Sequence, residues 1–166
     1  MSIFKFDEII LSKKECEYIM NLSKNRWVEP SIRVNKPDRS TYFHTFKLGD
    51  DELIDSIFEK ISSTLNRPID RIAELQVNRY QVGESFPLHY DQDGAIEYTF
   101  LIYLNDGFVG GETHFPNLVT KVVPKQGRAV CWVDSVGDRE LEYLSLHESM
   151  IIESGEKWMM AAFIRF

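Results

Sequence analysis

The sequence predicts an all-β core with flanking helices, and the periodicity of its apolar residues carries this prediction. A helical period is confined to the first 71 residues, and from residue 72 onward short apolar runs alternate with turn residues. Seven or eight such runs, separated by Gly, Pro, Asn or Asp, are typical of a β-sandwich or jelly roll. We therefore expect a jelly roll buttressed on one sheet by two or more N-terminal helices.

Two helices are expected before the β core. The stretch LSKKECEYIMNLSKNRW begins with Ser12 and Glu15 at the spacing of a capping box, and apolar residues follow at helical intervals. A second helix should begin at an Asp50 or Asp51 cap and end before Asn66. Between them, residues 28–48 contain two prolines and mixed charge before an alternating run, which indicates a loop leading into a short strand.

Seven apolar segments are the predicted strands. The last one alternates between two apolar faces, so we expect it to be a central strand of its sheet. Trp132 and Trp158, within the last three segments, are expected to pack in the core. The segments are AELQVNRYQV, IEYTFLIYLND, GETHFP, TKVVP, RAVCWV, LEYLSLH and KWMMAAFIRF.

The size and charge of the chain limit its organisation and its partners. Its 166 residues fit one domain, residues 1–166, with residues 1–71 as a helical buttress and residues 72–166 as the β core. A net charge of −7 argues against nucleic acid as a partner, because such binders rely on clustered Lys and Arg. Cys16 and Cys131 stand in apolar surroundings and are expected as free core thiols.

The expected location is the cytoplasm. Charged residues interrupt the apolar residues of MSIFKFDEIILSKKE, so this stretch does not have the pattern of a signal peptide. No later run approaches the roughly 18 apolar residues of a membrane span, so no membrane partner is expected.

The stretch SFPLHYDQDG offers a candidate metal site. Side chains two apart on a strand project to the same face, so His89 and Asp91 could grip a metal or form an ordinary hydrogen bond. Facial coordination of non-haem iron needs a second histidine. His44 and His114 are expected as ordinary strand or rim residues. His147 lies far enough after Asp91 for several strands to intervene, as a jelly roll requires.

Lys157 heads one apolar face of the last predicted strand. An unpaired buried ammonium costs several kcal/mol. The side chain therefore either extends to water at the strand end or meets a buried anion. Lys157 lies ten residues after the candidate ligand His147, which suggests an identity for a buried anion. A fixed cation near a metal could neutralise a dicarboxylate cosubstrate.

Several stretches together match one known family. They are LSKKECEYIMNLS, LQVNRYQVGESFPLHYD, YTFLIYLND, GGETHFP, VVPKQGRAVCW, SLHESMIIESGEKW and the final strand. On these stretches the sequence resembles the 2-oxoglutarate and Fe(II)-dependent dioxygenases, and within them the prolyl 4-hydroxylase family, over nearly its whole length. The order of His89-x-Asp91, His147 and Lys157 along the chain is a moderately specific mark of this family. Together with YLND and GGETHFP it is a strong one.

The resemblance implies a fold and a metal centre. The fold is a double-stranded β-helix, so that the whole chain would be one dioxygenase domain. The resemblance implies that His89, Asp91 and His147 hold the iron and that Lys157 holds the distal carboxylate of 2-oxoglutarate.

The resemblance also implies less specific roles for four other residues. Tyr80 and Tyr103 would contact the cosubstrate, although each could equally be a core aromatic. Arg39 and Ser40 fall in a segment of the buttress that resembles the mobile substrate-side loop of the family, and the alternative for both is a solvated turn.

The implied activity is hydroxylation of proline in a peptide or protein. The required cofactors would be Fe(II), 2-oxoglutarate and O2, with ascorbate as a candidate reductant, and succinate and CO2 would be released. One alternative keeps this chemistry and changes the substrate to a free amino acid or a small metabolite. An alternative of another class is a metal-binding jelly-roll module or a zinc hydrolase without oxygenase activity.

Overall fold

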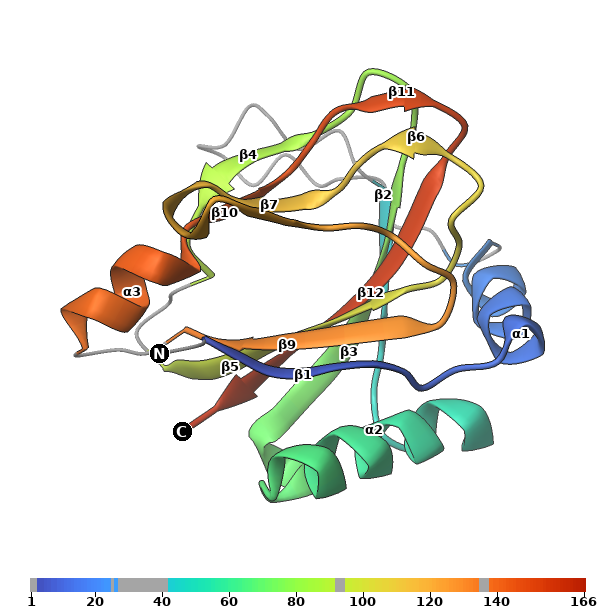
Figure 1. Cartoon of the computed structure of the whole chain (residues 1–166). Helices are drawn as coiled ribbons and strands as arrows, with labels where there is room; N and C mark the ends of the chain where they lie inside the picture. Colours follow the sequence, from blue (N-terminus) through green and yellow to red (C-terminus); the bar gives the residue numbers. More distant parts are fainter. Residues whose placement is uncertain (1–2, 25, 27–41, 92–94, 135–137) are drawn as a thin grey trace, which may run out of the picture.

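A computed structural model describes residues 3–24, 26, 42–91, 95–134 and 138–166 (Figure 1). Arg39 and Ser40 lie outside these residues. Two 3-10 turns, η1 (Ile69–Arg71) and η2 (Pro116–Leu118), separate some of the elements. The helices and strands in chain order are β1 (Phe4–Ile9), α1 (Lys13–Lys24), β2 (Tyr42–Phe46), α2 (Glu52–Leu65), β3 (Ile72–Tyr80), β4 (Phe86–His89), β5 (Ile96–Tyr103), β6 (Val109–Gly110), β7 (Thr113–Phe115), β8 (Thr120–Val122), β9 (Arg128–Val133), α3 (Arg139–Ser145), β10 (His147–Ser149), β11 (Ile152–Ser154) and β12 (Lys157–Arg165).

The strands form a six-stranded sheet that faces a smaller four-stranded one. The large sheet has the order β1-β9-β5-β12-β3-β2, the small sheet has the order β4-β10-β7-β8, and β11 pairs with β6. All of these pairings are antiparallel. The predicted jelly roll buttressed by helices is therefore confirmed, and β12 is a central strand as expected.

The sequence signals of the two N-terminal helices are confirmed in their caps. At α1 the Ser12 N–H donates to the Glu15 carboxylate at 2.6 Å, and the Glu15 N–H donates to the Ser12 hydroxyl at 3.3 Å. At α2 the Asp51 side chain accepts from the N–H groups of the first turn, which identifies Asp51 as the N-cap. The helix ends at Leu65, where Asn66 adopts a left-handed conformation with φ of 50°.

Both helices pack on the outer face of the large sheet, away from the small sheet (Figure 1). Alternation along β5 and β12 divides the side chains between this packing layer and the space between the sheets. On β12, Trp158 and Met160 join the helix-side core, whereas Met159 and Ala161 join a second cluster between the sheets. Trp132 is also buried in the second cluster, so both tryptophans are core residues as predicted.

The segment LEYLSLH is not a strand, which corrects the sequence-based prediction. Residues 139–145 form the short helix α3, capped by Asp138, whose carboxylate accepts from two N–H groups of the first turn. Leu141 and Leu144, at a helical spacing of three, pack on the cluster between the sheets. His147 consequently starts a separate strand, β10, instead of ending a longer one.

The large sheet also recruits strands from the N-terminal part of the chain. β1 pairs with β9 and β2 pairs with β3, although the sequence analysis assigned no strand to residues 4–9. Cys16 and Cys131 are free and buried, as expected. Among the described residues, no helix has the length and hydropathy needed to cross a membrane.

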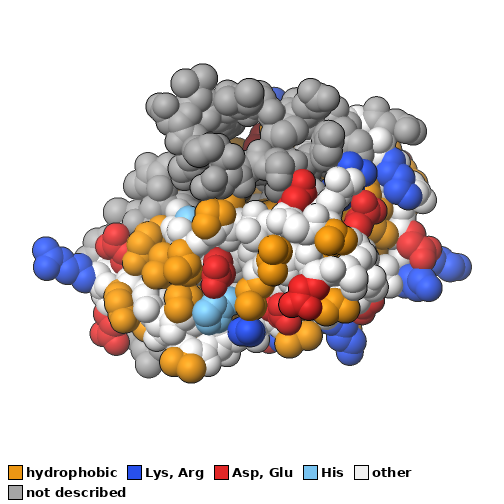
Figure 2. Space-filling model, turned by 90° about the horizontal axis from the view of Figure 1, so that it is seen from above, with side chains coloured by type: hydrophobic (Ala, Val, Ile, Leu, Met, Phe, Trp, Pro, Cys, Tyr) orange, Lys and Arg blue, Asp and Glu red, His pale blue; other side chains and the backbone are white. Residues whose placement is uncertain are grey.

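The face that carries the small sheet and the β6–β11 pair mixes apolar and charged side chains. Figure 2 views the molecule from this side and shows hydrophobic groups interspersed with acidic and histidine side chains. Leu88, Val109 and Ile151 are among the exposed apolar residues of these elements or their turns.

Candidate metal centre

The space between the two sheets contains a pocket lined by both polar and apolar side chains. The large sheet supplies most of its wall, and β4, β7 and β10 close the other side. Every residue predicted to bind metal is in its lining, together with Lys157 and Tyr80. The lining residues are Gln76, Asn78, Tyr80, Phe86, His89, Asp91, Thr99, Leu101, Thr113, Trp132, His147, Ser149, Lys157, Met159, Ala161 and Phe163.

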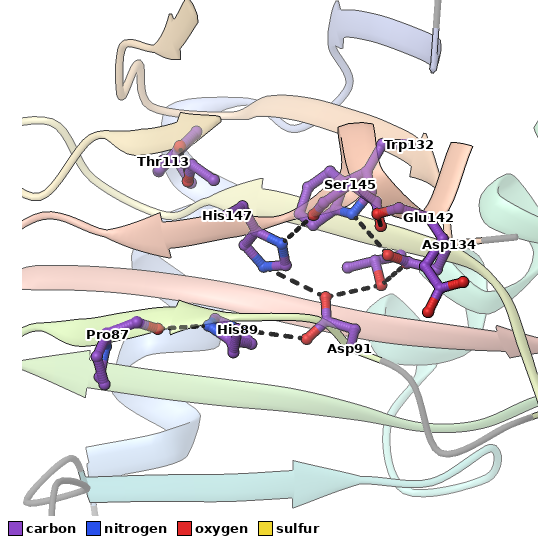
Figure 3. A network of polar contacts seen from close by, with 11 residues as sticks. Pro87, His89, Asp91, Thr113, Trp132, Asp134, Glu142, Ser145 and His147 are labelled. Carbon is purple, nitrogen blue, oxygen red and sulfur yellow. Dashed lines mark hydrogen bonds and ion pairs between the residues drawn. The ribbon is translucent and has the colours of Figure 1, made fainter. Parts of the chain in front are cut away.

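His89, Asp91 and His147 converge at this pocket (Figure 3). His89 ends β4 and His147 starts β10, and the two are paired across these strands. The Nε2 atom of His89 lies 3.3 Å from one Asp91 carboxylate oxygen, and the Nε2 atom of His147 lies 3.4 Å from the other. One ligand atom from each residue lies within 4.8 Å of the others. In the described part of the chain this is the one such cluster of three potential ligands.

Backbone carbonyls fix the orientation of both imidazoles. The Nδ1 atom of His89 is 2.7 Å from the Pro87 carbonyl oxygen, and that of His147 is 2.9 Å from the Ser145 carbonyl oxygen. Because a carbonyl oxygen only accepts, each Nδ1 carries the proton. Each Nε2 atom is therefore directed toward the cluster, where in the neutral form of the ring its lone pair is available to a metal, which is the usual arrangement of ligating histidines.

The charges at the cluster suit a divalent cation. Burial lowers the pKa of His147 against the opposing effect of the Asp91 carboxylate, so the imidazole favours the neutral form. Burial alone would raise the pKa of Asp91, but the neighbouring His147 and His89 keep it below its ordinary value. Two imidazoles and one carboxylate form the donor set of a facial triad, which leaves metal positions open and suits Fe(II).

Asp91 is also bound by the Thr99 hydroxyl, which connects it to Asp134 and Trp132, and the sequence analysis did not identify this part of the site. The Thr99 hydroxyl lies 3.0 Å from Asp91 Oδ2 and also contacts the carboxyl of Asp134. The Trp132 indole N–H donates to the other oxygen of Asp134 at 3.1 Å. The available signal was an acidic residue at the end of the apolar run AVCWV, where a fully buried carboxyl needs partners.

Lys157 is fully buried and does not extend to water. Its ammonium donates to the Gly111 carbonyl at 2.8 Å and to the Ser149 hydroxyl at 2.7 Å, and both acceptors are neutral. Burial lowers its pKa to about 7, against a smaller opposing effect of Glu112. Among the described residues, no carboxylate forms an ion pair with it. The side chain therefore does not extend to water, which was one of the two alternatives drawn from the sequence, and its meeting with an anion remains a prediction.

Two tyrosine rings and a glycine surround the Lys157 side chain. Its Nζ atom lies 5.2 Å from the ring centroid of Tyr80 and 5.6 Å from that of Tyr103. The Tyr103 hydroxyl is buried and lies 2.6 Å from the Thr113 hydroxyl. Gly111, with φ of +68°, approaches so closely that a Cβ atom there would lie 3.1 Å from Lys157 Cδ. The geometry thus places both tyrosines beside the cation, and their contact with a cosubstrate remains a prediction.

The remaining histidines are outside the cluster. His44 packs edge-on against Phe46, with ring centroids 4.4 Å apart. The Nδ1 atom of His114 lies 2.7 Å from a Glu148 carboxylate oxygen on the neighbouring strand. Both residues thus have the ordinary structural positions that the sequence analysis expected for them.

Comparisons with known proteins identify the family of this chain. A family model described as the 2OG-Fe(II) oxygenase superfamily matches residues 75–165. Prolyl 4-hydroxylase 13 of Arabidopsis thaliana is 28% identical over 93% of this chain, and prolyl 4-hydroxylase 5 of the same plant is 30% identical over 89%. The chain spans 68% of the first relative and 63% of the second, so it covers about two thirds of their length.

A solved structure shares the fold over nearly the whole chain. The viral collagen prolyl hydroxylase from Paramecium bursaria Chlorella virus-1, in its 2OG complex, is 27% identical to this chain with a TM-score of 0.77. The match covers 99% of this chain and 96% of the viral one. The fold, the pocket and the family match agree with the resemblance found in the sequence, and the chain belongs to the 2OG-Fe(II) oxygenase superfamily.

Proposed function

We propose that this chain is a 2-oxoglutarate- and Fe(II)-dependent hydroxylase that acts on prolyl residues of a peptide or protein. The observation that carries the proposal is the buried ammonium of Lys157 in the same pocket as the His89, Asp91 and His147 cluster. Family membership supports Fe(II), 2-oxoglutarate and O2 as the reactants beside the substrate. The three clustered residues would hold the iron, and Lys157 would bind the distal carboxylate of 2-oxoglutarate.

The residues of the pocket have distinct tasks in this reaction. When bound, the iron, 2-oxoglutarate and O2 supply the oxidising chemistry that hydroxylates a C–H bond and releases succinate and CO2. The carbonyl contacts to both Nδ1 atoms keep the imidazoles oriented with Nε2 toward the metal. Lys157 would supply a positive charge to the bound carboxylate, and because its side chain is fully buried the attraction would be strong. Apolar β12 side chains such as Met159 and Ala161 close the pocket wall.

The proline substrate is supported by the names of the relatives. The plant proteins are prolyl 4-hydroxylases, and the viral protein is a collagen prolyl hydroxylase. A proline-rich segment adopts the extended polyproline II form at little ordering cost, which would present its ring carbons to the pocket. No observation favours a free amino acid or a small metabolite. A zinc hydrolase would have no use for the cation of Lys157, so the pocket favours the oxygenase.

Two finer proposals concern the surroundings of the reaction. The free thiols of Cys16 and Cys131 are compatible with a reducing compartment, and we propose the cytoplasm. We propose ascorbate as the reductant that restores Fe(II), which its omission from a multiple-turnover assay would test.

The test of the proposed function has two steps. Anaerobic addition of Fe(II) and 2-oxoglutarate should produce a visible charge-transfer band. His147→Ala should abolish the band, whereas His114→Ala should preserve it because His114 lies outside the cluster. Succinate release is then measured with proline-containing peptides, free proline and peptides without proline. Absence of the band in the wild type would refute the metal centre, and succinate release without any dependence on proline would refute the substrate.

A further inference from the structure

The buried carboxyl of Asp134 has no task in the reaction described above. Asp134 follows β9 and is 0% exposed. Its Oδ1 atom accepts the Trp132 indole N–H, and its Oδ2 atom contacts the Thr99 hydroxyl (Figure 3). Within the described residues no Lys or Arg forms an ion pair with it. Burying such a group is costly unless its hydrogen bonds are satisfied, so its place beside the site requires an explanation.

The single proton of the Thr99 hydroxyl determines how Asp91, Thr99 and Asp134 are connected by hydrogen bonds. A threonine hydroxyl has one proton, yet this one contacts Asp91 Oδ2 at 3.0 Å and also the Oδ2 atom of Asp134. An ionised carboxylate only accepts, so one proton cannot satisfy two carboxylates. One of the two carboxyl groups must therefore donate. Asp91 needs its negative charge to bind a cation, which leaves Asp134 as the donor.

We propose that Asp134 is a positioning residue for the metal ligand Asp91, and that it acts as a neutral acid whose Oδ2–H donates to Thr99, which in turn donates to Asp91. This rests on the proposed function, because it takes Asp91 to be a metal ligand. The position of the acid proton follows from the geometry, since Oδ1 is already occupied by the Trp132 N–H.

The surroundings of Asp134 support the neutral form. Burial, reinforced by the negative charge of Asp91, raises the pKa of Asp134 to about 8. The same indole that binds Asp134 also packs against the second imidazole ligand, with the ring centroids of Trp132 and His147 4.9 Å apart. The Trp132 indole thus contacts both Asp134 and the second imidazole, whereas the link from Asp134 to Asp91 runs through Thr99.

Cobalt(II) affinity tests this role without depending on turnover. Thr99→Val removes the hydroxyl at nearly constant volume, and we expect about 10- to 100-fold weaker Co(II) binding, as for other partners of metal ligands. Thr99→Ser keeps the hydroxyl and should stay within about threefold of the wild type. Thr120→Val, on β8 outside the pocket lining, is the matched control and should bind Co(II) like the wild type.

Two substitutions of Asp134 separate hydrogen-bond donation from charge. Asp134→Asn retains a donor for Thr99 and an acceptor for the Trp132 N–H, so Co(II) affinity should remain within about threefold of the wild type. Asp134→Leu has a similar volume but neither polar group, and we expect about 10-fold weaker binding. Because Asp134 acts through Thr99, adding Asp134→Leu to Thr99→Val should cause little further loss.

The outcomes distinguish this role from the proposed function itself. If the wild type binds no Co(II), the metal centre and both proposals are wrong. If the wild type binds Co(II) but Thr99→Val does so equally well, only the positioning role is wrong. Equal losses for Asp134→Asn and Asp134→Leu would show that charge matters, and would overturn the neutral donor. If thermal unfolding shows that Thr99→Val does not fold, the comparison of Asp134→Asn with Asp134→Leu decides whether Asp134 positions the metal ligand.

Discussion

His89 and His147 are direct partners in the ladder between β4 and β10, and their ring centroids lie 4.3 Å apart. The register of one short strand pair therefore brings together two candidate ligands that are distant in sequence. Asp91 completes the cluster from just beyond β4, where the chain has left the strand. Strand pairing thus positions two of the three candidate ligands, and hydrogen bonds position the third, Asp91.

Removing the imidazole of His89 should greatly weaken metal binding. We expect His89→Ala to weaken Fe(II) or Co(II) binding at least about 100-fold, because two remaining ligands do not form a facial set. Anaerobic titration calorimetry measures the change. His44→Ala, on β2 outside the cluster, is the matched control, and a similar loss in that variant would show that the effect is a general one on folding.

Replacing the buried cation should affect the cosubstrate more than the metal. Lys157→Met removes the charge and keeps an unbranched side chain only one atom shorter. We expect 2-oxoglutarate to bind at least about 30-fold more weakly in the presence of Mn(II), because losing one partner of a buried charge pair costs about 2 kcal/mol or more. Mn(II) affinity without 2-oxoglutarate should change little. Unchanged 2-oxoglutarate affinity would exclude Lys157 from the carboxylate site.

The depressed pKa of Lys157 also predicts how stability depends on pH. A lysine in the unfolded chain has a pKa near 10.4, whereas burial lowers the folded-state pKa of Lys157 to about 7. Between these values the unfolded state binds the extra proton, so this group makes the free energy of unfolding rise with pH. In metal-free protein, the wild type should gain about 2 kcal/mol relative to Lys157→Met between pH 7 and pH 9.

Urea denaturation of both proteins across this range measures that difference. Saturating 2-oxoglutarate and Mn(II) should reduce the slope of the wild type, because a bound carboxylate favours the charged amine. A difference that is constant with pH would mean that Lys157 keeps its ordinary pKa in the folded protein.

Gly111 should not tolerate a side chain. A Cβ atom there would lie 2.5 Å from Ile152 Cδ1 and 3.1 Å from Lys157 Cδ, and the backbone has φ of +68°. We expect Gly111→Ala to cost about 1–3 kcal/mol of stability and to weaken 2-oxoglutarate binding by displacing the Lys157 side chain. Gly107→Ala is the control, because nothing lies within 4 Å of its added Cβ. Equal stability and 2-oxoglutarate affinity in the two variants would contradict this expectation.

Local signals predicted much of the fold and part of the site. The side chains of the capping residues Ser12 and Asp51 accept hydrogen bonds from backbone N–H groups two or three positions later, so sequence spacing was sufficient. The alternation along β12 predicted two apolar faces and a central strand, and the structure places one face in the helix-side core and the other between the sheets. That His89 and His147 lie close together was expected only through the family resemblance, because nothing local connects the two residues, and their pairing across β4 and β10 was not predicted.

Features that depend on distant contacts could not be predicted in this way. Residues 139–145 are too few for an apolar pattern to separate a helix from a strand, and the Asp138 cap decided the outcome. β1 has charged residues among its apolar ones and is recognisable as a strand only through its pairing with β9. The contact between Thr99 and Asp134 joins the middle of β5 to the residue after β9 in the folded sheet, so neither residue alone indicated it.

The alternation of β12 makes this strand intolerant of changes in length. A single inserted or deleted residue would turn Trp158 and Met160 toward the cofactor side and Met159 toward the helices. Such a shift in register would disrupt the packing against the helices and the lining of the pocket together, whereas an individual substitution can affect one without the other. Variation in this strand should therefore occur by exchange of residues at constant length.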